Sequence, residues 1–254
     1  MKPVVVIQNE VDAPPAYLGD ALDRRGVEWT VVRLHEGDVL PDPQDAAGAA
    51  ALGGAMGSYD EDAYPFLVEE KRFLARCTDR GVPVLGICLG CQLLADALGG
   101  RAYRAEAAEV LFAPIEPTIE GWREPIVAAF DGRPVVRFHR DTFDLPAGAT
   151  LLASAGGFTQ AFRMGSAVGI QPHPEITPAI LAGWLADGDA RQMTLEAGTD
   201  PDELVATFAA AETGVEATAA DVFDAWITEV VASGAGNGFH TTQPGVGEQL
   251  RSSN

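Results

Sequence analysis

The sequence has no long apolar run. Apolar residues make up 47% of its 254 residues, yet no uninterrupted apolar segment approaches the roughly 18 residues that a membrane span needs. The first ten residues, MKPVVVIQNE, become polar too soon for a signal peptide and are more typical of a first β-strand. We therefore expect no membrane association and a cytoplasmic location.

Cysteine is scarce, and histidine is scattered. The three cysteines, Cys77, Cys88 and Cys91, are too few and odd in number for a disulfide framework, so we expect reduced thiols. A zinc site usually takes paired ligands at short spacing. The four histidines stand singly along the chain, at His35, His139, His173 and His240. We therefore expect no metal site and no cofactor.

Basic residues are also few, and the formal net charge is −20. A field of this sign repels phosphate backbones and anionic lipids, which argues against nucleic acid as a partner. The acidity is concentrated between residues 176 and 231, where eleven acidic residues accompany one basic residue, Arg191. We interpret this segment as a solvated surface in preference to a docking face for a basic partner.

The first hundred residues alternate strand-like and helix-like segments. The expected strands are 3–7, 28–34, 48–54 and 82–87, and the expected helices are 14–26, 64–81 and 89–100. Alternation at this spacing predicts an α/β fold with a mostly parallel central sheet flanked by helices, a flavodoxin-like three-layer sandwich. Functional sites in such sheets form at the carboxyl ends of strands, where Gly54 and Cys88 both fall.

The pattern changes after residue 108. Short strands are expected at 109–116, 134–139, 149–154, 158–164 and 167–171, followed by helices at 178–187, 200–211 and 218–232. The last helix carries one apolar stripe, made of Val222, Phe223, Trp226, Ile227, Val230 and Val231. We expect a main domain of residues 1–190, an acidic helical C-terminal extension of 191–232 packed on it, and a flexible tail of 233–254.

Residues 86–90, Gly-Ile-Cys-Leu-Gly, suggest a nucleophile on a tight turn. A strand enters the turn and a helix leaves it, so Cys88 must adopt a strained backbone conformation between two glycines that avoid a clash. The turn would project the thiol from the sheet and place it at a helix N-terminus, whose partial positive charge favours a thiolate.

A Cys-x-x-Cys redox pair of Cys88 with Cys91 competes with this interpretation. Thioredoxin-like proteins also place such a pair between a strand and a helix, and on the local pattern alone the two interpretations are close. The redox interpretation gives the flanking glycines no role. The elbow interpretation additionally requires a base, an orienting carboxylate and oxyanion donors elsewhere in the chain.

All three requirements have candidates. In residues 169–175, GIQPHPE, two prolines stiffen the chain around His173, and the carboxylate of Glu175 can curl back to one imidazole nitrogen. In residues 52–57, LGGAMG, small residues such as Gly53 and Gly54 leave backbone N–H groups free to face a developing oxyanion.

Together these segments resemble the class I, triad-type glutamine amidotransferases, in particular stand-alone proteins similar to the glutaminase domain of GMP synthase. The resemblance covers about residues 2–190. It rests on GGAMGSYDED (53–62), GICLGCQLLADALGG (86–100), HRDTFDLPAGATLLASA (139–155), QAFR (160–163) and GIQPHPE (169–175). These motifs are specific in combination and in this order.

The resemblance implies a role for each candidate. Cys88 would be the nucleophile, His173 the general base and Glu175 the orienting acid. The backbone amides of Gly54 and Leu89 would stabilise the oxyanion. The remaining expected contacts to substrate are Gly53 in the oxyanion loop, Gln92 one turn beyond the nucleophile, and His139 and Asp141 in a loop lining the pocket. Cys91 and Cys77 would be packing residues.

The implied reaction is hydrolysis of the γ-carboxamide of glutamine through a γ-glutamyl thioester, with release of ammonia and glutamate. No ATP-pyrophosphatase signature of the Ser-Gly-Gly-x-Asp-Ser kind is present, so the chain would supply ammonia to a separate synthetase or hydrolyse another γ-glutamyl amide on its own. Leu111 stands where the family usually has glycine, and if the backbone at that position closes over the substrate, Leu111 reshapes the pocket. A non-catalytic binding module and a Cys-x-x-Cys redox protein are the remaining, less favoured alternatives.

Overall fold

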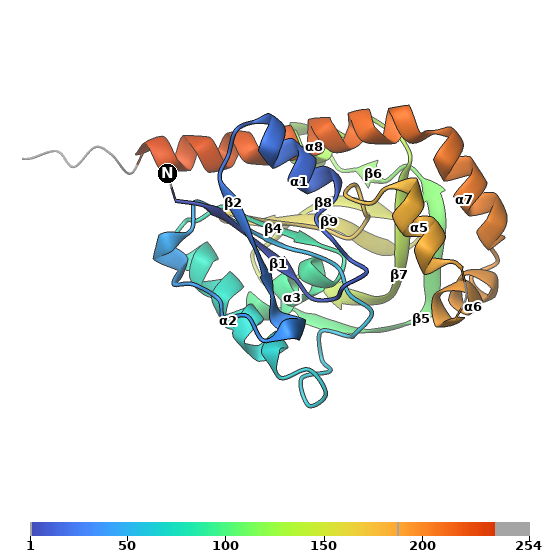
Figure 1. Cartoon of the computed structure of the whole chain (residues 1–254), viewed down its shortest axis with the longest axis horizontal. Helices are drawn as coiled ribbons and strands as arrows, with labels where there is room; N and C mark the ends of the chain where they lie inside the picture. Colours follow the sequence, from blue (N-terminus) through green and yellow to red (C-terminus); the bar gives the residue numbers. More distant parts are fainter. Residues whose placement is uncertain (1, 187, 237–254) are drawn as a thin grey trace, which may run out of the picture.

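The computed structural model describes residues 2–186 and 188–236 (Figure 1). Its strands are β1 (Val4–Gln8), β2 (Trp29–Arg33), β3 (Gly48–Ala51), β4 (Val84–Ile87), β5 (Arg101–Ala113), β6 (Glu116–Pro117), β7 (Val135–Asp144), β8 (Thr150–Ala155), β9 (Phe158–Met164) and β10 (Ala167–Ile170). Its α-helices are α1 (Tyr17–Arg24), α2 (Phe66–Asp79), α3 (Leu89–Ala97), α4 (Pro125–Ala128), α5 (Pro178–Trp184), α6 (Gly188–Glu196), α7 (Pro201–Ala210) and α8 (Glu212–Gly236). Three short 3-10 helices are η1 (Leu34–Glu36), η2 (Pro43–Asp45) and η3 (Gly121–Arg123).

Most of the strands form one sheet in the order β2-β1-β3-β4-β10-β9-β8-β6. Strands β2, β1, β3, β4 and β10 are parallel, and β9, β8 and β6 continue the sheet in antiparallel fashion. In β3 and β4, Ala51 pairs with Gly86, so the loops that follow these strands emerge at the same edge. The predicted α/β fold with a mostly parallel sheet is confirmed, and Cys88 lies at the edge where such folds carry their sites.

Helices cover both faces of this sheet. In β1, Val4 and Val6 belong to a core shared with α1, α4 and α8, whereas Val5 and Ile7 belong to a core shared with α2 and α3. Figure 1 shows α1 and α8 above the sheet and α2 and α3 below it. Because both faces are buried, β4 is apolar along its whole length and β1 is apolar up to its last residue, Gln8, which is the pattern that predicted a parallel sheet.

Strands β5 and β7 form a separate antiparallel ribbon beside the main sheet (Figure 1). The sequence predicted two shorter strands, at 109–116 and 134–139, and the structure corrects both. β5 begins at Arg101, and a register shift between Arg104 and Glu109 divides it into two paired segments. The residues between, AEAA, have no apolar alternation, so the sequence gives no sign that the strand continues through them. As a result His139 and Asp141 lie within a strand, not in the expected loop.

The helix expected at 178–187 ends earlier than predicted. α5 stops at Trp184, and α6 follows from Gly188 to Glu196, where the sequence suggested no helix. Gly188 has a φ of +72°, a conformation that favours glycine and separates the two helices. α6 buries only Met193 and Thr194, which explains why no amphipathic stripe revealed it. It packs against β5 in a third core, which also holds residues of α5, α7 and β7.

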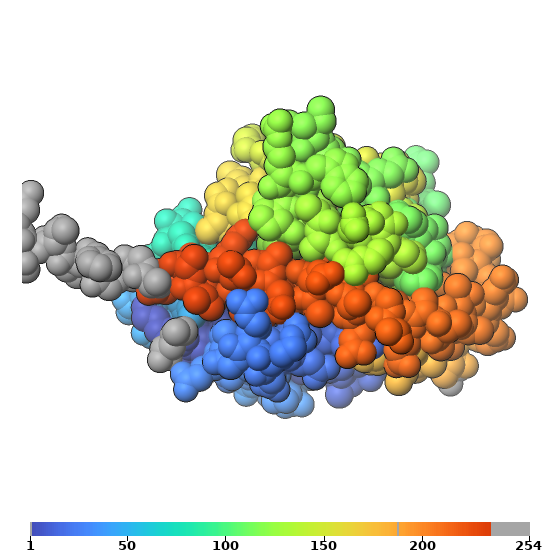
Figure 2. Space-filling view, turned by 90° about the horizontal axis from the view of Figure 1, so that it is seen from above, coloured from blue at the N-terminus to red at the C-terminus, as the bar shows by residue number. Residues whose placement is uncertain are grey.

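The last helix, α8, is longer than the predicted segment 218–232 and runs from Glu212 to Gly236. Five members of its apolar stripe are fully or almost fully buried against α1, α4 and the sheet: Val222, Phe223, Trp226, Ile227 and Val230. Val231 is 39% exposed and lies outside the buried stripe. Figure 2 shows α8 in red, running between the blue α1 and the green segment that contains α4. The remainder of the expected tail, 237–254, lies outside the described residues.

One buried carboxyl group supports the loop after β3. Glu70 of α2 is fully buried, and Nδ2 of Asn9 lies 3.3 Å from its Oε1. Nδ2 of Asn9 also reaches the carbonyl oxygen of Leu52, which precedes the Gly53 loop. Burial raises the pKa of Glu70 from its usual 4.5 to about 8, against the opposing effects of Asn9 and the Lys71 charge. Glu70 is therefore protonated at neutral pH.

This carboxyl group should make the fold less stable as the pH rises. The folded chain holds the proton that the unfolded chain releases, so the contribution of Glu70 is complete below about pH 4.5 and is lost progressively as the pH rises to about 8. The loss is roughly 1.4 kcal/mol per pH unit within this window. Glu70→Gln removes the titrating group and should flatten the profile of unfolding free energy against pH. Urea unfolding at pH 5 to 9 measures this profile.

The matched control is Glu69→Gln, one residue earlier on an exposed part of α2. This variant should retain the pH dependence of the wild type. If the wild type and Glu70→Gln gave parallel profiles of unfolding free energy against pH, Glu70 would be ionised in the folded protein.

Candidate active site

Cys88 lies on a sharp turn between β4 and α3. Its φ is +51°, a conformation that costs a residue other than glycine about 1–3 kcal/mol. Its backbone N–H donates to the carbonyl oxygen of Ile170 at 3.0 Å, which ties the turn to β10. A Cβ atom on Gly86 would lie 2.5 Å from the carbonyl oxygen of Gly90, and one on Gly90 would lie 2.1 Å from that of Ala51. The structure therefore contains the predicted elbow, and both glycines are sterically required.

His173 and Glu175 follow β10 and form a buried pair. Nδ1 of His173 lies 2.7 Å from Oε1 of Glu175, and each side chain is 3% exposed. The backbone N–H of His173 donates to the carbonyl oxygen of Val136 at 2.8 Å. The indole of Trp184 packs edge-on against the imidazole, with 5.3 Å between ring centroids. Because Glu175 engages Nδ1, Nε2 is the nitrogen left to exchange a proton with a reactant.

The charges of Cys88 and Glu175 both act on His173. Burial by itself lowers the pKa of His173, but the negative charges of Cys88 and Glu175, and their hydrogen bonds to the ring, raise it well above its usual value. With Cys88 and Glu175 beside it, the ring of His173 favours its protonated, imidazolium form. The N-terminus of α3 favours the same negative charge at Cys88.

Gly53 and Gly54 follow β3 and lie against the reactive side chains. A Cβ atom on Gly53 would be 3.3 Å from Cε1 of His173 and 3.8 Å from Cβ of Cys88. Gly54 and Cys88 line the same cavities. Leu89 is the first residue of α3, so its N–H has no acceptor within the helix. These positions bring the backbone expected to supply oxyanion donors next to the nucleophile.

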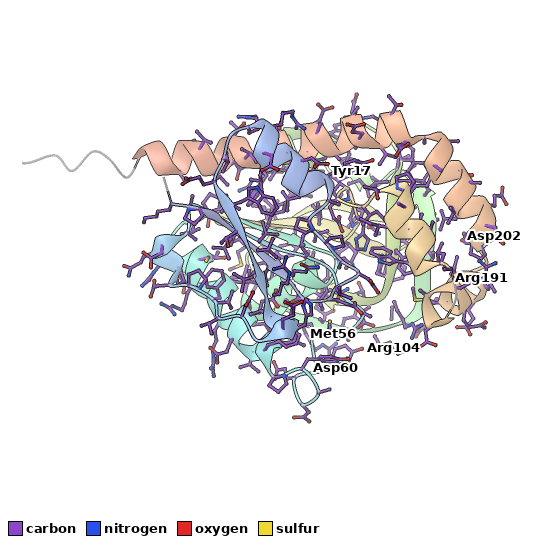
Figure 3. The ribbon with its side chains drawn as sticks, viewed as in Figure 1. Tyr17, Met56, Asp60, Arg104, Arg191 and Asp202 are labelled. Atoms are coloured by element: carbon purple, nitrogen blue, oxygen red, sulfur yellow. The ribbon has the colours of Figure 1, made fainter. Side chains whose placement is uncertain are left out.

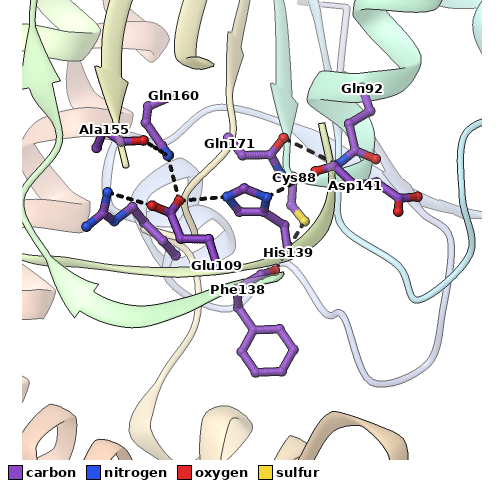
Figure 4. Close-up of polar contacts among 10 residues, drawn as sticks. Cys88, Gln92, Glu109, Phe138, His139, Asp141, Ala155, Gln160 and Gln171 are labelled. Atoms are coloured by element: carbon purple, nitrogen blue, oxygen red, sulfur yellow. Dashed lines mark hydrogen bonds and ion pairs between the residues drawn. The ribbon is translucent and has the colours of Figure 1, made fainter. Parts of the chain in front are cut away.

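Gln92 and Asp141 come together beside Cys88. Nε2 of Gln92 donates to the carbonyl oxygen of Asp141 at 3.1 Å and to Oε1 of Gln171 at 3.3 Å (Figure 4). The side chain of Asp141 accepts a hydrogen bond from Tyr59, whose pKa burial and this carboxylate raise to about 12. Tyr59 was not singled out from the sequence, although it belongs to the 53–62 motif.

His139 has both ring nitrogens engaged within the protein. Nδ1 lies 3.0 Å from the carbonyl oxygen of Asp141, and Nε2 lies 2.8 Å from Oε2 of Glu109 (Figure 4). His139 was expected to contact substrate. The ring lines the cavity, but its nitrogens hold β7 and β5 together and offer no free polar atom to a ligand.

Glu109 is the centre of a buried polar network that the sequence did not reveal. Its Oε1 lies 2.9 Å from Nη1 of Arg137, and its Oε2 accepts from Nε2 of Gln160 at 2.6 Å (Figure 4). These residues lie on β5, β7 and β9, so the network joins the ribbon to the main sheet. Gln160 belongs to the 160–163 motif, whereas Glu109 and Arg137 were expected as members of the strands at 109–116 and 134–139.

Two cavities meet at Cys88. The first, about 270 Å³, is lined by Gln92, Tyr59, Arg104 and Asp141, and we call it the Gln92-side cavity. The second, about 280 Å³, is lined by His173, Trp184, Glu10 and Asp12, and we call it the His173-side cavity. Figure 3 shows Arg104 and two further residues of the Gln92-side cavity, Met56 and Asp60, close together at the lower edge of the molecule. Cys88 therefore lies between two cavities that are lined by different side chains.

Part of these walls comes from α6, which the sequence did not predict. Ala190 borders both cavities, and Asp189 and Met193 line the Gln92-side cavity. Leu111 lies on β5 opposite Arg137 and lines neither cavity. Of the α6 residues that do line them, Asp189 and Ala190 precede the expected extension and Met193 lies within it.

The other two cysteines are buried packing residues. Burial raises the pKa of Cys91 well above its usual value, and the neighbouring charge of Cys88 adds to the effect. Burial likewise raises the pKa of Cys77 to about 12. Both belong to the core between the sheet and α2 and α3, whereas Cys88 borders the cavities. This separation disfavours a redox pair of Cys88 with Cys91.

Within residues 2–186 and 188–236, no cluster of three or more His, Cys, Asp or Glu side chains is arranged to hold a metal ion. None of the helices in these ranges has the length and apolar character to cross a bilayer.

The sequence has relatives of known family. Residues 16–182 match the family described as Glutamine amidotransferase class-I. A putative glutamine amidotransferase-like protein, YfeJ, of Salmonella typhimurium strain LT2 is 30% identical over 187 residues, which cover 70% of this chain and 77% of that protein. A glutamine-hydrolysing GMP synthase of Thermomicrobium roseum is 36% identical over 148 residues, 55% of this chain and 26% of the synthase. The match to this synthase thus involves about a quarter of its length.

Two solved structures share the fold. A glutamine amidotransferase of Thermotoga maritima superimposes with a TM-score of 0.76 at 27% identity, covering 89% of this chain and 97% of that one. A glutamine amidotransferase of Methylobacillus flagellatus gives a TM-score of 0.80 at 25% identity, covering 90% and 95%. The family match spans well over half of the chain and includes Cys88, His173 and Glu175. The two solved structures have the same fold as this chain. We conclude that this chain belongs to the class-I glutamine amidotransferases.

Proposed function

We propose that the chain hydrolyses the γ-carboxamide of glutamine or of a related γ-glutamyl amide, with Cys88, His173 and Glu175 as a catalytic triad. Membership of the family supports hydrolysis or transfer of the glutamine amide. The observation that carries the finer proposal is the 2.7 Å pair of His173 and Glu175 beside a cysteine held on a strained elbow. A binding module has no need of these three groups together.

The reaction runs in two steps. The thiolate of Cys88 attacks the γ-carbonyl carbon and forms a C–S bond; the imidazolium of His173 gives its Nε2 proton to the amide nitrogen, the C–N bond breaks and ammonia leaves. Neutral His173 then accepts a proton from water as the water attacks the thioester carbon. The C–S bond breaks, glutamate is released, and the thiolate–imidazolium pair is restored.

Residues in and beside the cavities bind the substrate and stabilise its oxyanion in the proposed reaction. The amides of Gly54 and Leu89 donate to the oxyanion that forms in each step. In the Gln92-side cavity, Arg104 suits the α-carboxylate of a γ-glutamyl group, and Asp141 suits its α-ammonium group. Gln92 positions the chain of the substrate between them.

The released ammonia has two possible fates. The matched synthase of Thermomicrobium roseum is described as glutamine-hydrolysing, and the chain matches a quarter of its length. We therefore propose that a separate ammonia-accepting synthetase is one partner, and that free-standing hydrolysis is the alternative. All three thiols are free, which fits the reducing cytoplasm that the sequence predicts.

The experiment measures ammonia and glutamate released by the purified chain from glutamine. An electrophilic glutamine analogue should at the same time stop the reaction and add its mass to the peptide that contains Cys88. Equal release of the two products with one adduct per chain is the expected result. Labelling of Cys91 in place of Cys88, or no label and no release, would contradict the triad.

A further inference from the structure

The two cavities at Cys88 hold different parts of a substrate. His173 must deliver a proton to the leaving nitrogen, so the leaving amine lies on the side of the nucleophile that His173 lines. That side is the His173-side cavity, because His173 borders it and does not border the Gln92-side cavity. The γ-glutamyl group then occupies the Gln92-side cavity, where cationic and anionic side chains match an amino acid head.

The His173-side cavity is larger than ammonia requires. Its volume of about 280 Å³ is several times the roughly 30 Å³ that one water molecule takes up in the liquid. Ammonia is about the size of water, so glutamine leaves most of this space to solvent. An amide whose nitrogen carries a chain of several atoms would use it.

Apart from His173, the charged side chains that line this cavity are negative. Glu10 and Asp12 line it, and no lysine or arginine does. Oε2 of Glu10 accepts from the backbone N–H of Ala55 at 2.8 Å, which holds this carboxylate at the mouth of the glycine loop. Among the described residues, no salt bridge neutralises either carboxylate. The Gln92-side cavity, in contrast, carries both signs, because Arg104 and Arg140 line it together with Asp60, Asp141 and Asp189.

Trp184 fixes the shape of the wall. Its Nε1–H donates to the carbonyl oxygen of Asp12 at 2.8 Å, which connects α5 to the loop after β1. The indole also contacts the rings of His173 and Phe138, with centroids 5.3 and 5.5 Å apart. Tryptophan is the best aromatic partner for a cation, and a carboxylate beside it adds an ion pair. The cavity therefore combines a built aromatic wall with unneutralised negative charge, next to the catalytic histidine.

We propose that the His173-side cavity is a leaving-group pocket that selects γ-glutamyl amides of amines carrying a second, cationic group. The proposal rests on the function proposed above. Cys88 attacks the γ-carbonyl carbon, the C–N bond breaks, and the proton of His173 passes to the departing nitrogen. The products are the free diamine and, after water cleaves the thioester, glutamate.

The test compares three amides with the same five methylene groups. They are the γ-glutamyl amides of 1,5-diaminopentane, hexylamine and 6-aminohexanoic acid, whose tails end in a cation, a methyl group and a carboxylate. The value of kcat/KM should be about tenfold higher for the cationic than for the neutral amide, and lower still for the anionic one. It should also exceed the value for glutamine. The preference should fall as salt is added, because it is electrostatic.

Substitutions test whether the preference for the cationic amide depends on the carboxylates of Glu10 and Asp12. In Glu10→Gln with Asp12→Asn, the ratio of the cationic to the neutral amide should fall to about one. The matched control is Asp45→Asn with Asp79→Asn, which removes the same charge at exposed positions at the opposite end of the parallel strands. The control should keep the wild-type ratio. Equal values for the cationic and neutral amides in the wild type, or a preference that survives in the Glu10 and Asp12 variant, would overturn the proposal.

A binding measurement separates this proposal from the function on which it rests. In Cys88→Ser, calorimetry should show tighter binding of the cationic than of the neutral amide. If no amide is hydrolysed and no analogue labels Cys88 but this difference in affinity persists, the triad proposal fails and the pocket stands. If the difference in affinity is absent, the pocket fails, whatever the rate of glutamine hydrolysis.

Discussion

Serine at position 88 should lower the rate of glutamate release by about 10⁴-fold or more. The side chain keeps nearly the same shape, so the elbow between β4 and α3 should remain. What changes is the nucleophile: beside a positive charge and a helix N-terminus, a thiol forms its nucleophilic thiolate far more readily than an alcohol, a much weaker acid, forms an alkoxide. The electrophilic analogue should no longer label position 88.

Cys91→Ala provides the control. Cys91 is fully buried in the core below the sheet, and it borders neither cavity. The rate of the variant should stay within about threefold of the wild type, at some loss of stability from the missing sulfur atom. If Cys91→Ala lost activity as completely as Cys88→Ser, a Cys-x-x-Cys chemistry would replace the triad.

The second large effect concerns stability. Gly90→Ala should destabilise the fold by roughly 3 kcal/mol or more. The new Cβ atom would lie 2.1 Å from the carbonyl oxygen of Ala51 and 2.6 Å from its carbon. These are backbone atoms of a central strand, so no change of rotamer relieves the contact. The backbone N–H of Gly90 also donates to the carbonyl oxygen of Leu52 at 3.1 Å, and this bond must lengthen as β3 and α3 separate.

The midpoint of urea unfolding measures this effect, and Gly214→Ala is the matched control. A Cβ atom on Gly214 meets nothing within 4 Å. Because alanine is favoured over glycine in a helix by about 1 kcal/mol, the control should be slightly more stable than the wild type. An unchanged midpoint for Gly90→Ala would show that β3 and α3 are further apart than described here. Because Leu52 precedes the Gly53 loop, we also expect the folded fraction of Gly90→Ala to be less active.

The arrangement of residues around Cys88 was predictable because each of its parts is encoded locally. Gly86, Cys88 and Gly90 define a turn whose sterics require that spacing, and the structure shows the clashes that a larger residue would cause. His173 and Glu175 are two residues apart, so one short segment sets their hydrogen bond. Apolar runs at βαβ spacing likewise predicted the parallel part of the sheet.

The walls around this centre were not predictable because they form between distant segments. Glu109 meets Arg137 and Gln160 only through the pairing of β5 with β7 and the stacking of this ribbon on β9, and no sequence spacing encodes that arrangement. The register shift after Arg104 removes the alternation that would have revealed the full length of β5. α6 was missed because it buries so few side chains, although Asp189 and Met193 line the Gln92-side cavity.

The position of α8 has a consequence for the order of events during synthesis. Arg24 of α1 contacts Asp224 of α8 at 2.9 Å, across 200 positions of the chain. Trp226 fills the core above β1, whose Val4 and Val6 are among the first residues made. Contacts of such long range slow folding, and domains generally fold as units. The elbow at Cys88 therefore emerges from the ribosome long before the helix that covers its sheet, and the nascent chain should depend on chaperones to protect this apolar face until α8 has been translated.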